Sequence, residues 1–193
     1  MDTVNTVAIE ASPSLLSARE ISRATEYLNS TRDALLAAVT GLDASQWDFK
    51  PMPVQWSIAE ILEHIAIVEN RVHSLIGRMK DAPPAEAGRN DAQIDEFVIA
   101  AVPQRSTKFE APPQILPSHQ WTPAETLERF TGSRAHTIHL LLNAPFLRGH
   151  VAPHPVFGPW DGYQWILAAA GHAARHTEQI QEVKGCIGFP AAG

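Results

Sequence analysis

Two histidines four residues apart, His172 and His176, are the side chains in this sequence best suited to binding a metal ion. In a helix, a step of four residues returns to within about 40° of its starting direction and rises about 6 Å, so both imidazoles would point the same way. Both also fall in a series of inward positions shared with Trp165, Ala169 and Ile180, where a helical bundle normally places leucine or isoleucine. The spacing therefore favours chelation of one ion.

A third histidine, His64, lies on the edge of another apolar stripe, three residues after Ile61 and four before Val68. Three neutral imidazoles from two helices would form a facial set of nitrogens and leave coordination positions for water or substrate, as chemically active metal sites do. The alternative is that each histidine is a hydrogen-bonded residue of the core or its boundary. Pairs at this spacing also occur by chance in a chain with 9 histidines, so both interpretations stay open.

Three further polar residues are candidates for catalysis, each with a structural alternative. Glu60 precedes His64 by one turn and could orient it or act as a general base, but it is also the last residue of a capping box. Gln179 follows His176 by three and could border the site or face solvent. Arg134 lies beside an apolar stripe and could bind a substrate carboxylate, extend to solvent, or pair with a carboxylate of the bundle.

Aromatic residues and further histidines near these positions are weaker candidates. Trp56 and Trp165 could line a pocket, although a core position or a hydrophobic staple explains them as well. His154 lies in a segment rich in proline and could sit near the mouth of a pocket. His136 and His139 lie off the predicted buried side of their helix, so we interpret both as boundary residues.

Four segments with a period of about 3.6 residues would position these side chains, and each begins with a capping box. We expect the four helices to end near Gly41, after Met79 at Asp81, before Pro145 and at Gly185. The four boxes pair Ser17 with Glu20, Ser57 with Glu60, Thr122 with Glu125, and Asp161 with Gln164.

About forty residues with six prolines, 81–121, separate the second and third helices, which is far too long for a tight turn. We expect one short helix over 91–101 and then an extended strip through Phe109 and Ile115. A second irregular segment, 144–160, is expected to fold over one end, and no alternating pattern indicates a strand. The predicted fold is all-α: a four-helix bundle with a long crossover between helices 2 and 3, as one domain over 17–185 with tails at 1–16 and 186–193.

The composition excludes several classes of protein. The chain has 193 residues, one cysteine (Cys186) and a formal charge of −6, without a run of like charges, so we expect neither a nucleic-acid partner nor a disulfide framework. No stretch is apolar for ~18 residues, and the first sixteen residues lack a basic region, so we expect a cytoplasmic protein that does not contact membranes. A homodimer is compatible with the sequence, but no interface can be located.

Several motifs resemble those of the DinB/YfiT-like superfamily over about residues 17–184. The resemblance implies a four-helix bundle that binds a divalent metal, such as nickel or zinc, through one histidine of the second helix and an HxxxH pair of the fourth. The matching positions here are His64, His172 and His176. The resemblance also implies metal-dependent hydrolases or thiol-dependent transferases and isomerases among bacterial relatives, beside members without a known activity. The motifs are WSIAEILEHI (56–65), HPVFG (154–158), GYQW (162–165) and HAARHTEQI (172–180).

The leading functional hypothesis is a metalloenzyme, either a hydrolase or a transferase that uses a low-molecular-weight thiol, acting on a small-molecule substrate. The expected cofactor is one divalent ion, zinc or nickel first, with iron or manganese as alternatives. The competing hypothesis is a non-catalytic, metal-stabilised bundle that binds a ligand or serves in stress. A helical interaction module without metal is the third. No residue spacing identifies the bond that is broken.

Overall fold

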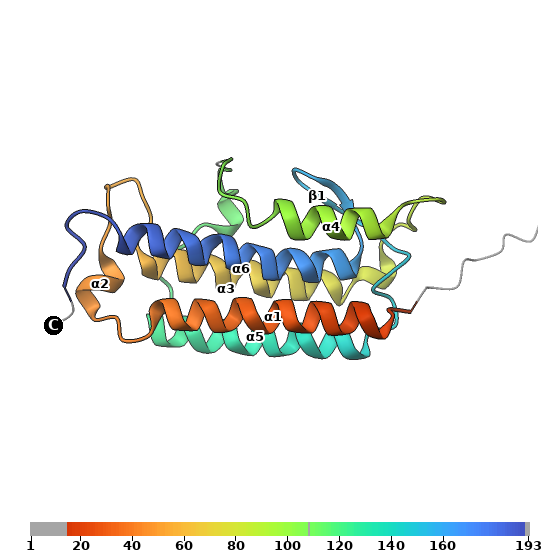
Figure 1. The fold of residues 1–193 in the computed structure, drawn as a ribbon, viewed down its shortest axis with the longest axis horizontal. Helices are drawn as coiled ribbons and strands as arrows, with labels where there is room; N and C mark the ends of the chain where they lie inside the picture. The colour runs from red at the N-terminus through yellow and green to blue at the C-terminus, as the bar shows by residue number, and fades with distance from the viewer. Residues whose placement is uncertain (1–14, 108, 192–193) are drawn as a thin grey trace, which may run out of the picture.

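Helices form most of the structure, a computed structural model that describes residues 15–107 and 109–191. Four long helices lie side by side, and each packs mainly against two of the others (Figure 1). Helices α1 and α3 both contact α5 and α6, so α5 and α6 occupy opposite corners. The predicted helical class is confirmed. The four long helices are α1 (Ala18–Val39), α3 (Ile58–Ile76), α5 (Pro123–Asn143) and α6 (Gly162–Lys184).

All four predicted capping boxes are present, so the sequence located every long-helix start correctly. At the start of α3, the Glu60 amide donates to Ser57 Oγ (3.3 Å), and the Ser57 amide donates to Glu60 Oε2 (2.8 Å). The predicted end of this helix is wrong: α3 stops at Ile76. A separate turn of 3₁₀ helix, η1 (Met79–Asp81), then brings Met79 into the core, which explains why its spacing fitted the apolar stripe.

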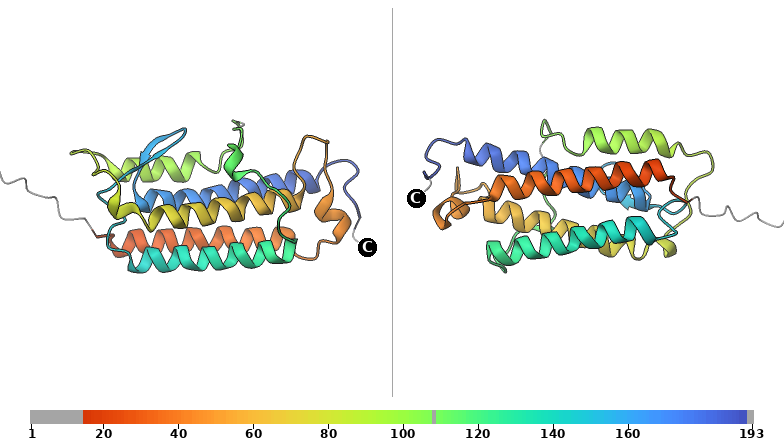
Figure 2. Two further views of the ribbon diagram at one scale, coloured as in Figure 1. Left: turned by 180° about the vertical axis from the view of Figure 1, so that it is seen from behind. Right: turned by 60° about the horizontal axis from the view of Figure 1, so that its bottom comes forward.

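The long crossover contains the expected short helix, α4 (Asp91–Ala101), which packs on the outer side of α6 (Figure 1). The strip that follows contacts α3 through a 3₁₀ turn, η2 (Pro113–Ile115), and crosses the back of the molecule in Figure 2. A further short helix, α2 (Ala44–Asp48), lies between α1 and α3. The sequence does not predict α2, because five residues are too few to show an apolar period of 3.6 residues.

Residues 144–160 contain a two-stranded antiparallel hairpin, β1 (Ala152–His154) and β2 (Gly158–Trp160), so the expectation of no strands is wrong. The strands are three residues long, too short for an alternating pattern to show. The segment does lie over one end of the helices, as predicted: Arg148 is buried and binds Asp95 of α4 and Asp161, the N-cap of α6, at 2.6 and 2.7 Å.

The two predicted tails differ in how much the structure describes. Of the N-terminal tail, residues 1–14 lie outside the described residues. The C-terminal tail packs on α2: the Phe189 and Phe49 rings meet edge to face at 5.4 Å, and Gln46 Nε2 donates to the Pro190 carbonyl (3.0 Å). Among the described residues, no helix is both long and apolar enough for a bilayer span.

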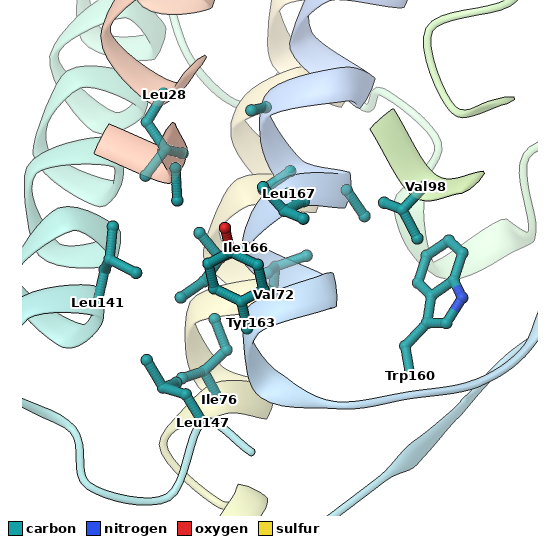
Figure 3. Close-up of a cluster of buried hydrophobic side chains, with 14 residues drawn as sticks. Leu28, Val72, Ile76, Val98, Leu141, Leu147, Trp160, Tyr163, Ile166 and Leu167 are labelled. Atoms are coloured by element: carbon teal, nitrogen blue, oxygen red, sulfur yellow. The ribbon is translucent and has the colours of Figure 1, made fainter. Parts of the chain in front are cut away.

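Two clusters of buried apolar side chains form the core. One surrounds Tyr163 and lies towards the hairpin end (Figure 3). The other lies towards α2 and includes Ile61 and Ile65 of α3. Along α6, Ala170 belongs to the first cluster and Ala173 to the second, so His172 lies at the junction between them. A polar side chain therefore lies between the two apolar clusters.

Candidate metal centre

The structure brings together the three histidines that the sequence singled out. One candidate ligand atom from each of His64, His172 and His176 lies within 4.8 Å of the others. His64 comes from the second turn of α3, and the pair comes from the middle of α6, which packs against α3. His64 and His176 are buried, and His172 is partly exposed. The cluster therefore joins two neighbouring long helices and reaches the surface through one member.

Two of the three imidazoles have a fixed orientation. His64 Nδ1 lies 2.7 Å from the Ile115 carbonyl oxygen, and His176 Nδ1 lies 2.8 Å from Gln179 Oε1. Both oxygens can only accept, so each Nδ1 carries the proton and each Nε2 keeps its lone pair. Histidines that bind metals are oriented by the same kind of contact on the far ring nitrogen.

The spacing of one pair of nitrogens fits a shared ion. His64 Nε2 and His172 Nε2 lie 3.1 Å apart. Two nitrogens at the usual ~2.1 Å from a metal and 3.1 Å from each other subtend about 95° at the ion, between octahedral and tetrahedral values. The ring centroids are 4.4 to 4.9 Å apart, so the rings converge without stacking. Neutral nitrogen donors of this kind suit zinc, nickel and iron(II).

Desolvation by the surrounding protein, together with mutual repulsion, keeps the three imidazoles neutral, although His172 is partly exposed. Burial lowers the pKa of His64 below its ordinary value, despite the hydrogen bond to Ile115, which favours the charged form. Burial together with repulsion from the neighbouring histidines lowers the pKa of His176 to about 3 and that of His172 well below its usual range. Unprotonated nitrogens are the form that binds a metal, so no proton has to leave these rings at neutral pH.

Trp56, the residue before the cap of α3, forms one wall of the cluster. Its ring centroid lies 4.8 Å from that of His64 and 6.5 Å from that of His176. The sequence allowed a pocket role for Trp56 and for Trp165, and the structure separates the two. Trp165 instead contacts Trp160 and His154, at 5.3 and 5.2 Å.

The three weaker catalytic candidates have structural partners. Glu60 forms the capping box and an ion pair with Lys50 Nζ (2.7 Å). Arg134 has no exposed side-chain surface and binds Glu69 of α3 through two hydrogen bonds, of 2.7 and 2.9 Å. These contacts match the capping and ion-pair alternatives. Gln179 borders the cluster through its hydrogen bond to His176.

Two groups that contribute to the site are not among the residues predicted from the sequence. One is the Ile115 carbonyl, which a residue type cannot reveal because every residue has one. The other is Glu63, which is 2% exposed and holds the crossover beside His64. Glu63 did give a signal: apart from His64 it is the one polar residue from Ile61 to Ala66, where only a residue with a partner is expected.

The remaining histidines lie apart from the cluster. The His154 ring packs on Trp160 at 4.1 Å, and burial lowers the pKa of His154 to about 4. His136 and His139 are exposed on α5, as the boundary interpretation predicted, although the His136 ring also contacts His73 of α3 at 4.0 Å.

Comparisons with known proteins identify the family of this chain. The DinB superfamily profile matches residues 27–180, which include all three histidines. The uncharacterised protein YuaE of Bacillus subtilis (strain 168) is 30% identical over 149 residues, which cover 75% of this chain and 86% of that protein. No solved structure matches the chain. The family match and the relative together show that this chain belongs to the DinB superfamily.

Proposed function

We propose that the protein is a divalent-metal-dependent enzyme whose ion is held by His64, His172 and His176. The observation that carries this proposal is the convergence of three neutral imidazole nitrogens within 4.8 Å. Hydrogen bonds at Nδ1 orient two of the rings, those of His64 and His176. Three protein ligands leave positions free, which distinguishes a catalytic site from a closed structural one. The four long helices would serve as a bundle that supplies ligands from facing helices.

A divalent ion at this site would supply Lewis-acid chemistry, which favours loss of a proton from water or from a small thiol and polarises a substrate carbonyl. The surrounding residues prepare the site for it. Ile115 and Gln179 keep the Nδ1 protons of His64 and His176 directed away from the cluster. Trp56 packs beside the His64 ring and faces that of His176 at a greater distance, 4.8 and 6.5 Å between centroids.

Two reaction classes fit this set of residues: hydrolysis of a carbonyl-type substrate, and transfer of a low-molecular-weight thiol to an electrophile. Both need a base, and Glu60 is poorly placed for that task because its oxygens bind Ser57, Lys50 and His119. We therefore expect the attacking thiol or water to give its proton to bulk water at the partly exposed side of the site, beside His172, rather than to a carboxylate of α3.

The first test is the metal content of the protein purified without a histidine tag or chelator, beside the double variant His172→Ala/His176→Ala. We expect close to one zinc, nickel or iron per chain, and none in the variant. Both proteins are then assayed with esters, with amides, and with small thiols plus electrophiles.

The outcomes separate the hypotheses. Turnover that the double variant loses while it stays folded supports the enzyme. Bound metal without turnover, together with a large loss of thermal stability in the variant, supports the metal-stabilised, non-catalytic bundle. A wild-type protein that stays free of metal after incubation with zinc, nickel and iron(II) would refute both.

A further inference from the structure

The residue before His64 binds the crossover through four hydrogen bonds. Glu63 Oε1 accepts from the Ser118 amide (3.1 Å), from Ser118 Oγ (3.2 Å) and from the Gln120 amide (3.4 Å). Glu63 Oε2 accepts from the His119 amide (2.9 Å). Three consecutive backbone N–H groups thus converge on one carboxylate, an arrangement that in other proteins binds anions. Here the chain supplies the anion itself.

The carboxylate is charged and its loop is strained. Burial alone would raise the pKa of Glu63, but the hydrogen bonds from Ser118, His119 and Gln120 hold it below its ordinary value. His119 has a φ of 57°, in the left-handed region that non-glycine residues seldom adopt. Such a conformation persists only where neighbouring contacts enforce it. The hydrogen bond from the His119 amide to Glu63 and the contact of His119 Nε2 with Glu60 Oε1 (3.1 Å) are such contacts.

The same strip of crossover orients a metal ligand. Ile115, three residues before Ser118, accepts the hydrogen bond from His64 Nδ1 (2.7 Å). On the other side of Ile115, the Gln114 carbonyl accepts from Arg71 of α3 (3.2 Å). The Ile115 carbonyl is therefore held between two charge-assisted contacts with α3, and Glu63 forms four hydrogen bonds where Arg71 forms one.

We propose that Glu63 is a positioning residue for the metal centre: by fixing residues 115–120 on α3, it holds the Ile115 carbonyl where it sets the tautomer and direction of His64. In other proteins, contacts on the far side of a ligating histidine raise metal affinity by about 10–100-fold. The inference rests on the proposed metal site and adds to it a residue that touches neither ion nor substrate.

Linkage gives the proposal a second consequence. If the strip orients His64 for the ion, the bound ion must in turn stabilise the strip by the same factor. The amides of Ser118, His119 and Gln120 should then exchange hydrogen more slowly in the metal-loaded protein than in the metal-free one.

The test is the dissociation constant for zinc, measured by competition with a chromophoric chelator, for the wild type and for Glu63→Gln. A glutamine replaces one acceptor oxygen with an NH₂ group, which cannot accept from the amides of residues 118–120. Residues 115–120 should therefore detach from α3, while α3 keeps its length. We expect zinc affinity to fall by about 10–100-fold.

Two control variants are matched to Glu63→Gln. His119→Gly keeps the amide and suits the positive φ, so its affinity should stay within about threefold of wild type.

The second control, Leu141→Ala, removes a buried side chain of α5 from the core cluster around Tyr163, which contains none of residues 115–120, so its zinc affinity should not change. Equal affinity in Glu63→Gln and wild type would overturn the proposal, and so would a loss as large in Leu141→Ala. Should Glu63→Gln fail to fold, hydrogen exchange of the wild type decides: unchanged exchange at residues 118–120 on zinc binding overturns the proposal. A wild type that binds no zinc, nickel or iron(II) refutes the metal site itself.

Discussion

The buried pair of Arg134 and Glu69 makes a sharp prediction about stability. Both side chains are almost wholly excluded from solvent, at 0% and 1% exposed. Arg134 binds both oxygens of Glu69 and, through Nη1, the Leu28 carbonyl (2.6 Å) and Thr31 Oγ1 (2.9 Å). The pair thus joins α5 to α3 and to α1. Glu69→Gln preserves shape but leaves a buried guanidinium without a counter-charge.

Removing one member of a buried pair costs about 3–5 kcal/mol, because the remaining charge stays buried. For a chain of this length, each kcal/mol lowers Tm by about 2–4 °C, so Glu69→Gln should melt roughly 6–20 °C below wild type. The double variant Arg134→Met/Glu69→Leu removes both charges and should recover most of that loss. Urea unfolding followed by circular dichroism, in the presence of EDTA, gives the free energies. A cost below about 1 kcal/mol for Glu69→Gln would refute the reasoning.

The same variants separate two roles for Arg134. If Arg134 serves only the fold, the double variant should keep the metal affinity of wild type and any turnover found for it. If Arg134 binds a substrate carboxylate, the double variant should stay folded and raise KM with little change in zinc affinity. Its closed set of partners favours the first outcome.

Two further predictions concern α6 and the hairpin. A Cβ at Gly171 would lie 3.1 Å from Val102, so Gly171→Ala should destabilise by about 1–3 kcal/mol in urea unfolding, whereas Gly132→Ala on α5, with nothing within 4 Å, should stabilise by up to about 1 kcal/mol. Burial lowers the pKa of His154 from 6.5 to about 4, so below 6.5 the unfolded chain binds the extra proton. Wild type should therefore lose stability relative to His154→Phe as pH falls from 6.5 to about 4, and a difference independent of pH would contradict the assigned burial.

The sequence predicted the elements whose signal is both local and repeated. Each long helix has an apolar period and a capping box, and His64, His172 and His176 interrupt that period with a residue type that binds metals. The apolar spacing alone, without a signal for the helix end, led to a wrong prediction of where α3 stops. Met79 continues the spacing of α3 but belongs to a separate turn, because its position in the core does not require the helix to continue.

The partners of the polar core residues could not be predicted for a different reason. Glu63 and Glu69 are both buried acids, and burial of a carboxylate requires that each has a partner. Which partner it is depends on where distant segments lie: Glu69 binds Arg134, 65 residues away, and Glu63 binds a loop 55 residues away. Nothing local to either glutamate carries that information.

The rotation of α6 links its packing to the direction of its histidines. At Gly171 the helix passes so close to its neighbours that an added Cβ would lie 3.1 Å from Val102, just beyond α4, and 3.3 Å from the Tyr27 hydroxyl of α1. Only one face of α6 can approach both neighbours in this way. His172 lies 100° further round, where the helix meets α3 and His64. A glycine with poor helix propensity thus fixes which way the HxxxH pair points, so the candidate centre depends on packing at a different face of the helix.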